Sequence, residues 1–439
     1  MLLYENIEAK ILSILKMGIN PFERFVSTGE IKENFPVVKS RTSILNKISN
    51  IINDENNFVL PIIGSVGIGK THLFWALKNK MYRYNFIYIS LNNVYKKFFY
   101  NLYSEFIENI FVIDRENKKS HHDVFVNLKK DFNENISNNG KHFKKGNVKR
   151  DVSTPGIEIL RVITRDMCKK WGGLERKYGF FHIADLEKVK ETAYQILKNK
   201  FKDDEQDVLK DVINIIVSHQ LDPENGMEAE RWLLGELMDL KELSQLNMKF
   251  DLRKNKAAFI ILKLFIENSN KKTVLFIDDF DILISLLHSK NEYEEQVFDP
   301  SWLYGDVKSP DEAIAKKLLK NFMMLHRIGG LKIIITLKSL DELEELKMIF
   351  RDMEEQFLSS IKEPIFLLPF NQEDVFEFYK LKMRFFYDFL DMTNISEDLI
   401  ENCFPIGKER LIEIYESTGG NPREITKKLV NYFNDIIAY

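Results

Sequence analysis

The stretch "NFVLPIIGSVGIGKTHLFWALKNK" (57–80) decides the fold of this chain, because it joins an apolar strand, a glycine-rich turn and a helix. Gly64, Gly69, Lys70 and Thr71 fit the spacing G-x-x-x-x-G-K-[ST], which is typical of phosphate-binding loops. In such a loop the backbone N–H groups surround phosphate oxygens, and the helix dipole adds positive potential. The alternative is a glycine-rich turn with a chance lysine, which accounts less well for both flanks.

The loop predicts a nucleotide site with Mg²⁺. Lys70 is expected to reach the β- and γ-phosphates, and the Thr71 hydroxyl is expected to bind Mg²⁺. No N-K-x-D-type element for reading guanine is found, so ATP is favoured over GTP. The expected nucleotide-binding residues are Gly64, Ser65, Val66, Gly67, Ile68, Gly69, Lys70, Thr71 and His72, together with Val37, Val38 and Arg41 beside the adenine.

The composition of the chain limits which other functions are expected. The chain has 439 residues, enough for two or three domains, and its net charge of −3 gives no overall basic excess for nucleic acid. Cys168 and Cys403 lie far apart, which predicts no disulfide framework and favours the reducing cytoplasm. The N-terminal segment has an amphipathic pattern rather than that of a signal peptide, and no apolar run is long enough to span a membrane.

Five apolar stretches predict buried strands of a parallel sheet. Because these runs are continuous rather than alternating, we expect helices to cover both faces, and the helical patterns between them give the α/β class. The stretches are "NFVLPII" (57–63), "NFIYISL" (85–91), "KTVLFID" (272–278), "LKIIITL" (331–337) and "PIFLLPF" (364–370).

A large insertion separates the glycine-rich loop from the next catalytic element. It starts with a Lys- and Asn-rich stretch (115–156) that predicts a loop with short helices, and it continues with helical periodicity over 157–250. The expected parts are a lead-in with an N-terminal helix (1–34), a first nucleotide-domain segment (35–111), a mostly helical insertion (112–255), a second nucleotide-domain segment (256–370) and a C-terminal helical region (371–439).

Acidic residues follow the third predicted strand in "VLFIDDFD" (274–281). Asp278 is expected to lie near Mg²⁺, and Asp279 to orient or activate water for attack on the γ-phosphate. Asp281 is expected only to cap the next helix. The alternative for the whole stretch is an Asp-rich helix N-terminus, which the neighbouring loop makes the less favoured interpretation.

Three further candidates act on phosphate. Thr336 or Ser339, after the fourth strand, is expected to sense the γ-phosphate or the water, and the spacing does not choose between them. Arg423 in "GGNPR" is expected to reach phosphate oxygens from the C-terminal helices, unless it is an ordinary surface arginine. Arg351 is a weaker candidate for an arginine finger to a neighbouring subunit, and a surface salt bridge explains it equally well.

These motifs together resemble the AAA+ and STAND P-loop ATPases near the Orc/Cdc6-like branch. The most specific parts are "EPIFLLPFNQEDV", which resembles the start of a lid, and "STGGNPREI", which resembles a sensor-2 element. A second likeness, "ERWLLGELMDLKEL" (230–243), is to ORC-like ATP-binding proteins of defence islands, BREX systems among them. The resemblance covers about 35–111 and 228–439.

The resemblance implies a P-loop αβα sandwich with a five-stranded parallel sheet and a helical lid. It places Walker A at Gly64 to Thr71, Walker B at Asp278 and Asp279, and sensor 2 at Arg423. Two departures stand out. The family usually has Glu where this chain has Asp279, which argues for slow turnover, and the chain ends too soon after Arg423 for the winged-helix domain of origin-binding relatives.

Two functions are expected from different classes. The first is an ATPase switch or motor acting on DNA or a DNA-bound partner, in replication, mobile-element or defence machinery. The second is a nucleotide-locked scaffold that turns over little and recruits a protein partner through its insertion; a small-molecule kinase is less favoured. The basic stretch "KHFKKGNVKR" (141–150) is a candidate DNA contact, although a solvated loop is more common. We expect a homo-oligomer or a protein partner, and no membrane.

Overall fold

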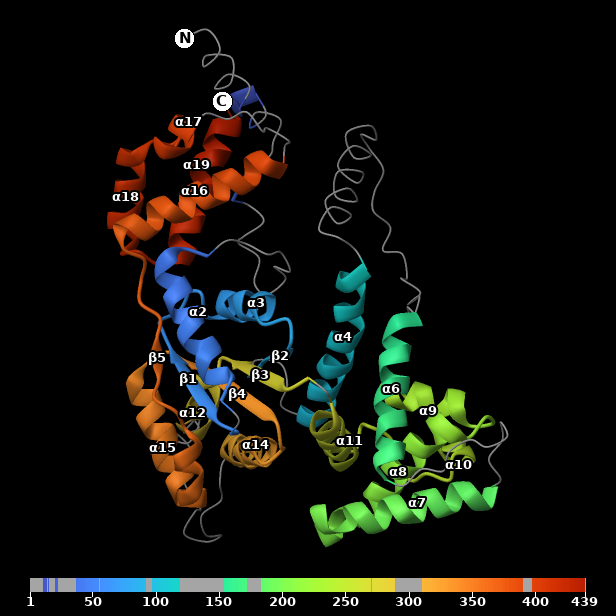
Figure 1. The fold of residues 1–439 in the computed structure, drawn as a ribbon. Helices are drawn as coiled ribbons and strands as arrows, with labels where there is room; N and C mark the ends of the chain where they lie inside the picture. The colour runs from blue at the N-terminus through green and yellow to red at the C-terminus, as the bar shows by residue number, and fades with distance from the viewer. Residues whose placement is uncertain are drawn as a thin grey trace, which may run out of the picture. The chain divides into compact units, whose positions relative to one another are not determined.

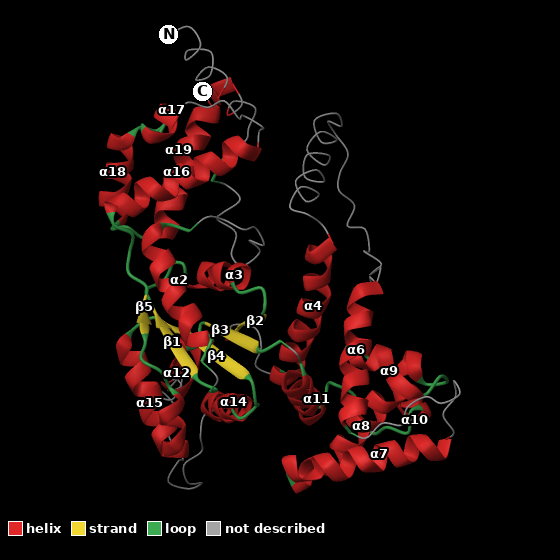
Figure 2. Cartoon of the chain, in the orientation of Figure 1, coloured by secondary structure: helices red, strands yellow, loops and turns green. Residues whose placement is uncertain are grey.

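The structure, a computed structural model, describes residues 11–13, 15, 20–22, 37–54, 56–91, 97–118, 154–171, 183–269, 271–288, 310–389 and 397–438. These residues form a parallel sheet accompanied by many helices, as Figure 1 and Figure 2 show. The predicted α/β class is therefore confirmed. The basic stretch 141–150 lies outside the described residues.

The sheet has five strands in the order β2-β3-β4-β1-β5, so the strand that leads into the glycine-rich loop lies inside the sheet. β1 pairs in parallel with β4 on one side and with β5 on the other, and Ile63 at its end lies opposite Leu337. The strands are β1 (Val59–Ile63), β2 (Asn85–Ser90), β3 (Thr273–Asp278), β4 (Leu331–Leu337) and β5 (Ile365–Phe366).

β5 is much shorter than the stretch 364–370 that the sequence predicts. Pro364 and Pro369 bracket this strand, and neither has an N–H group to donate to a sheet ladder. The pairing extends one residue further, because Leu367 N donates to Ile63 O at 2.8 Å. The apolar character of this stretch was correctly recognised, but proline limits its regular hydrogen bonding.

The chain divides into two compact units, which we describe separately. Unit 1 comprises 1–82, 276–285 and 333–439. Its helices are α2 (Lys39–Ile52), α3 (Lys70–Lys80), α15 (Leu340–Glu354), α16 (Gln372–Phe389), α17 (Glu397–Glu401), α18 (Lys408–Thr418) and α19 (Pro422–Ala438), with the 3-10 helix η5 (Glu355–Ser360) and the start of α12 (Asp281–His288).

Unit 2 comprises 83–275 and 286–332, and helices make up most of it. The helical periodicity of 157–250 corresponds to α6 through α10. The helices of unit 2 are α4 (Phe98–Lys118), α6 (Thr154–Lys170), α7 (Ile183–Leu197), α8 (Gln206–Leu221), α9 (Gly226–Leu233), α10 (Leu240–Gln245), α11 (Asn255–Asn268) and α14 (Pro310–His326), with the 3-10 helices η3 (Lys198–Lys200) and η4 (Asp203–Glu205).

The helices of the C-terminal region begin and end at the residues that the sequence marks. Asn371 and Asp374 cap α16 reciprocally: Asp374 N donates to Asn371 Oδ1 at 2.8 Å, and Asn371 N donates to Asp374 Oδ2 at 3.1 Å. α18 ends before Gly419, which has a left-handed backbone, and α19 begins at Pro422. These local signals therefore place the segment 419–423 between two helices.

Residues from both ends of the sequence share one apolar cluster in unit 1. Ile11, Leu15 and Phe22 are buried together with side chains of α16 through α19. Asn20 Nδ2 donates to Val430 O at 2.9 Å and to Asn434 Oδ1 at 2.7 Å. The described part of the N-terminal segment is thus packed into the C-terminal helical cluster, a contact that no local sequence pattern predicts.

Within the described residues, no helix combines the length and the apolar character that crossing a membrane requires. Cys168 and Cys403 are both buried and free.

Candidate functional site

The glycine-rich loop joins β1 to α3 and turns through two left-handed backbone positions. Gly67 has φ +83° and Gly69 has φ +101°, and residues with a Cβ rarely adopt this region. Gly69 directly precedes Lys70, the first residue of α3. A Cβ at Gly67 would also lie 2.7 Å from Asn421 Oδ1, so glycine is required here by both conformation and space.

Lys70 is folded back onto the loop that carries it. Its Nζ donates to Gly64 O at 2.5 Å and to Ser65 O at 3.3 Å. Burial lowers the pKa of Lys70, and the charge of Lys338 acts in the same direction, while nearby aspartates oppose the shift. The ammonium group is therefore held by neutral carbonyl oxygens, which an anion can replace as a stronger partner.

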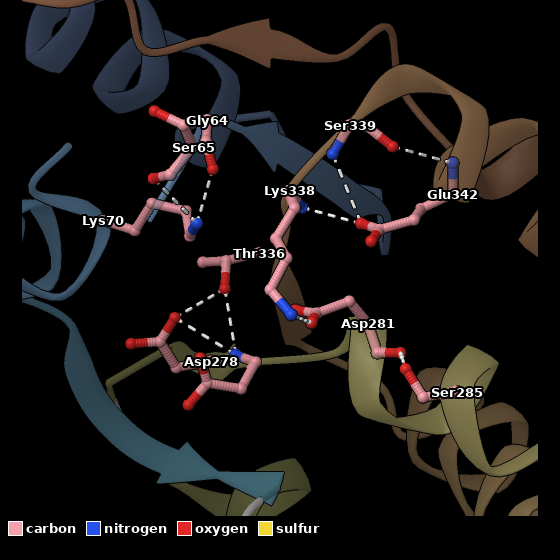
Figure 3. Close-up of polar contacts among 11 residues, drawn as sticks. Gly64, Ser65, Lys70, Asp278, Asp281, Ser285, Thr336, Lys338, Ser339 and Glu342 are labelled. Atoms are coloured by element: carbon pink, nitrogen blue, oxygen red, sulfur yellow. Dashed lines mark hydrogen bonds and ion pairs between the residues drawn. The ribbon is translucent and has the colours of Figure 1, made fainter. Parts of the chain in front are cut away.

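A chain of hydrogen bonds links α3, β3 and β4 through Asp278. Thr71 Oγ1 donates to Asp278 Oδ2 at 2.6 Å, and Thr336 Oγ1 donates to Asp278 Oδ1 at 2.5 Å. Asp278 and Thr336 are both buried, and Figure 3 shows them close to Lys70 at the ends of their strands. The structure thus brings together four of the predicted site residues, Lys70, Thr71, Asp278 and Thr336.

Asp279 turns the chain away from β3 with an unusual backbone. Its φ is +57°, and its N–H donates to Thr336 Oγ1 at 3.0 Å and to Asp278 Oδ1 at 3.2 Å. A left-handed aspartate costs conformational energy, so these bonds and the Phe280 N–Thr336 O bond of 3.1 Å hold it in place. The backbone of Asp279 is therefore fixed at the end of β3, directly beside Asp278.

Thr336 and Ser339 have different hydrogen-bond partners in the structure. Thr336 is fully buried and contacts Asp278, whereas Ser339 is the N-cap of α15 and its Oγ accepts from Glu342 N at 3.2 Å. Glu342 Oε2 in turn accepts from Ser339 N at 3.2 Å. Ser339 thus forms a capping box. Thr336 is the one of the two whose hydroxyl bonds to Asp278 and Asp279.

Of the predicted adenine-side residues, Arg41 contacts the glycine-rich loop. Val38 precedes α2 and is buried, and Val37 is half-buried. Arg41 Nη2 donates to Leu368 O at 2.6 Å and to Ile68 O at 3.3 Å, and its guanidinium lies 5.4 Å from the centre of the Phe370 ring. Burial lowers the pKa of Arg41, and the charge of Asp374 partly restores it. Arg41 therefore links the loop to the segment that enters α16.

His72 follows Thr71 in the first turn of α3. Its pKa is lowered to about 4, first by burial and then by the positive charges of Lys382 and Arg41. The imidazole is consequently neutral near pH 7.

The start of α19 contacts the glycine-rich loop directly. Arg423 N donates to Gly67 O at 3.2 Å, and Asn421 Nδ2 donates to Val66 O at 2.9 Å. Arg423 itself is exposed. Its backbone therefore lies beside the loop, whereas its contact with phosphate stays a prediction. Asn421 supplies a contact with the loop that the sequence analysis did not assign.

Arg351 lies elsewhere in unit 1. It is exposed in the last turn of α15, and no contact between it and the glycine-rich loop is found among the described residues. Its predicted role in a neighbouring subunit stays a prediction.

A pair of side chains that the sequence analysis did not assign completes the cluster. Lys338, directly after β4, forms an ion pair with Asp281 Oδ2 at the start of α12. The expectation that Asp281 only caps a helix was incomplete, because its carboxylate binds Lys338 (Figure 3).

The donor set is suited to a hard cation. Hydroxyl and carboxylate oxygens of Thr71 and Asp278 are the ligands that Mg²⁺ prefers, and Mg²⁺ commonly takes its remaining ligands from phosphates and water. Within the described ranges, no group of three or more His, Cys, Asp or Glu side chains could hold a metal ion without such help.

No protein-family model matches this sequence, and no curated protein matches it either. Any assignment of function therefore depends on the loop, the acids and the contacts just described.

Proposed function

We propose that this chain is a P-loop ATPase of the AAA+/STAND type, similar to the Orc/Cdc6-like branch, with residues 371–439 as its helical lid. The observation that carries the proposal is the hydrogen bond of 2.6 Å between Thr71 Oγ1 and Asp278 Oδ2, directly beside Lys70. In P-loop NTPases these residue types at these positions hold Mg²⁺ and the phosphates.

Binding of MgATP rearranges the contacts around Lys70. The ammonium group leaves the carbonyls of Gly64 and Ser65 for phosphate oxygens, which are stronger acceptors. Thr71 and Asp278 would hold Mg²⁺, which would neutralise part of the phosphate charge. Thr336 keeps Asp278 in the required orientation through its hydroxyl.

Hydrolysis is assigned to Asp279. Water attacks the γ-phosphorus, the bond to the β–γ bridging oxygen breaks, and ADP and phosphate form, while Asp279 orients the water and accepts its proton. Arg423 adds positive charge from the lid, and Arg351 is proposed to act in a neighbouring subunit of an oligomer.

The lid is proposed to report the nucleotide state through residues 421–423. Since Asn421 and Arg423 bond to the carbonyls of Val66 and Gly67, a change in the loop on phosphate binding alters the contacts of α19. The work of this switch is proposed to be done on DNA or on a DNA-bound partner, which rests on the resemblance and on the basic stretch 141–150.

ATP hydrolysis by wild type, Lys70→Ala and Asp279→Asn, each with and without single- and double-stranded DNA, tests this proposal. We expect turnover that needs both residues and rises with DNA. Lys80→Ala is the matched control, because Lys80 lies on the same helix but at its far end, where it contacts Asn46. Failure of wild type to bind any nucleotide would refute the proposal.

The second candidate, a nucleotide-locked scaffold that recruits a protein partner through 112–255, has one specific observation in its favour. The proposed base is an aspartate with φ +57° rather than a longer glutamate, so its carboxylate has a short reach from a constrained backbone. Tight ATP retention through purification, abolished by Lys70→Ala, combined with negligible turnover under every condition, would favour the scaffold over the motor.

A further inference from the structure

Two leucines of unit 2 are exposed where the chain passes from α9 to α10, two helices that Figure 1 labels. Leu237 is 62% exposed and Leu240 is 82% exposed. They belong to the stretch 230–243, to which the proposed ATPase assigns no role. Trp232 and Leu233 of the same stretch are buried in unit 2. One part of this stretch therefore belongs to the core, and the other part presents apolar side chains to solvent.

Both leucines line the same open hollow on the surface of unit 2, which has a volume of about 660 Å³. Single exposed apolar side chains are ordinary on a protein surface, whereas neighbouring ones around a hollow are typical of a contact site. Covering them with another apolar surface is favourable, because it removes them from water. The hollow is lined by Leu237, Met238, Asp239, Leu240, Lys241 and Arg253.

The backbone that carries the two leucines is fixed at three points. The Tyr100 hydroxyl on α4 donates to Gly235 O at 3.1 Å. Arg253 Nη2 donates to Met238 O at 3.2 Å. The Asp239 carboxylate caps α10 and accepts from two N–H groups of its first turn, each at 2.8 Å. A surface that is held in this way loses little conformational entropy when a partner binds, so the hollow is preorganised for contact.

The acidic side chains beside the hollow are engaged within the chain. Arg231 Nε donates to Glu236 Oε2 at 2.9 Å, and Arg231 Nη1 donates to Glu242 Oε1 at 3.0 Å. Asp251 forms an ion pair with Arg253, and Asp239 is the N-cap of α10. These contacts offset much of the negative charge near the two leucines.

Lys241 is the cation at this hollow whose charge is not offset in the same way. It is exposed, and no ion pair of Lys241 is found in the part of the chain that the structure describes. Arg253 adds a second guanidinium or ammonium cation to the lining, with its side chain 45% exposed. A partner with carboxylates would meet positive charge here, whereas a basic partner would meet Lys241 without an available acid.

We propose that this hollow docks an acidic, apolar segment of a protein partner. Apolar side chains of the segment cover Leu237 and Leu240, and its carboxylates face Lys241 and Arg253. The inference goes beyond the proposed ATPase, because it holds with or without nucleotide turnover. It also supplies the partner-binding surface that the scaffold candidate requires of the insertion.

Selection from a random library of 12-residue peptides displayed on phage tests the proposal. The full chain is the target, and the double variant Leu237→Ser with Leu240→Ser is used for counter-selection. Both side chains are exposed, so thermal unfolding of the double variant is expected to match that of wild type. We expect enriched peptides that combine apolar residues with Asp and Glu. No enrichment over the counter-selection, or enrichment of basic peptides, would overturn the proposal.

Affinities of the enriched peptides then test each side chain separately, by fluorescence anisotropy with the full chain. Leu240→Ser is expected to weaken binding by about tenfold or more, since an apolar contact is lost. Met348→Ser is the matched control, because Met348 is 56% exposed on α15 in unit 1. An equal loss of affinity in both variants would contradict docking at this hollow.

Reversing one charge tests the chemistry assigned to the partner. Lys241→Glu is expected to weaken an enriched acidic peptide by about fivefold, and to strengthen the same peptide with its acids replaced by lysine. Lys188→Glu is the matched control, since Lys188 is exposed on α7 of the same unit and changes the net charge equally. Identical effects of the two reversals would show that only the overall charge matters.

Two further measurements separate this proposal from its alternatives. If sedimentation shows that wild type self-associates and that the double leucine variant does not, the hollow binds a second copy of the chain and the proposal is overturned. Nucleotide binding by the double variant is expected to equal that of wild type. Loss of peptide binding therefore leaves the ATPase proposal intact, and absence of nucleotide binding by wild type leaves the docking proposal intact.

Discussion

The hydroxyl of Thr336 lies 2.5 Å from Asp278 Oδ1 and also accepts a hydrogen bond of 3.0 Å from Asp279 N. One buried side chain on β4 therefore orients two consecutive acids at the end of β3. In the proposed function these acids have different tasks, metal binding and water activation. Thr336 acts through them and is a positioning residue in this structure.

Thr336→Val is expected to impair both acids at once. Valine keeps the shape of the side chain, but Asp279 N and Asp278 Oδ1 each lose one hydrogen bond. This loss is expected to lower the free energy of unfolding by about 1–3 kcal/mol. Turnover is expected to fall more than nucleotide affinity. Chemical denaturation and ATPase assays check this, with Thr336→Ser as the control that keeps the hydroxyl. A stable, fully active Thr336→Val would contradict the assignment.

Gly67→Ala is expected to disturb the loop and its contact with α19 together. The φ of +83° costs about 1–2 kcal/mol for a residue with a Cβ, and the new atom would lie 2.7 Å from Asn421 Oδ1. We expect lower stability and about tenfold weaker nucleotide binding, equivalent to about 1.4 kcal/mol.

Gly329→Ala is the comparison for this change, because a Cβ at that position would have no neighbouring atom closer than 3.8 Å. Thermal unfolding and nucleotide titration of both variants provide the measurement. Equal, small effects at the two positions would show that the contact between the loop and residues 421–423 is unimportant.

Asp279 allows conformational strain to be measured separately from its proposed chemistry. Asp279→Ala and Asp279→Gly both remove the carboxylate, so turnover is expected to fall at least about a hundredfold in each. Because φ is +57°, the alanine variant is expected to be less stable than the glycine variant by about 1 kcal/mol.

Asn247 offers the matched pair of substitutions, since its φ is +54°. The alanine and glycine variants at Asn247 are expected to differ in stability in the same direction while turnover is retained. Identical stability of the two variants at Asp279 would mean that the left-handed backbone carries no strain.

The low pKa of His72 predicts a loss of stability in acid. The unfolded imidazole binds a proton below its ordinary pKa of 6.5, whereas the folded one does so only near 4. Between these values the unfolded state holds more protons, so stability falls as the pH is lowered, by roughly 2–3 kcal/mol from this group.

Denaturation of wild type and His72→Gln at pH 7, 6, 5 and 4 measures this contribution. The variant is expected to lose less stability than wild type over this range, since glutamine does not titrate. Parallel curves for the two proteins would show that His72 is freely protonated in the folded state.

The loop and the acids could be located from the sequence because their signals are local. The glycine spacing before Lys70, and the run of aspartates after an apolar strand, each lie within a few residues. The same is true of the Asn371 cap and the Gly419 stop. The five strands were recognisable by their apolar runs, although the prolines beside β5 shorten its ladder.

Contacts between distant segments could not be predicted in this way. The pairing of Asp281 with Lys338, and of Asn421 with the loop, depends on where separate segments meet in space.

A local signal did distinguish Ser339 from Thr336, because Ser339 and Glu342 have the S-x-x-E spacing of a capping box. That signal predicts Ser339 as the N-cap of the following helix, so Thr336 is the residue of the two that is available to contact Asp278.

The cluster that joins Phe22 to the C-terminal helices has a consequence for how the chain assembles. Asn20 and Asn434 are 414 positions apart, so their contact closes a very long loop, and the entropy lost in closing it must be recovered by packing. The apolar side chains near residue 11 are therefore buried only once the helices around Asn434 have formed.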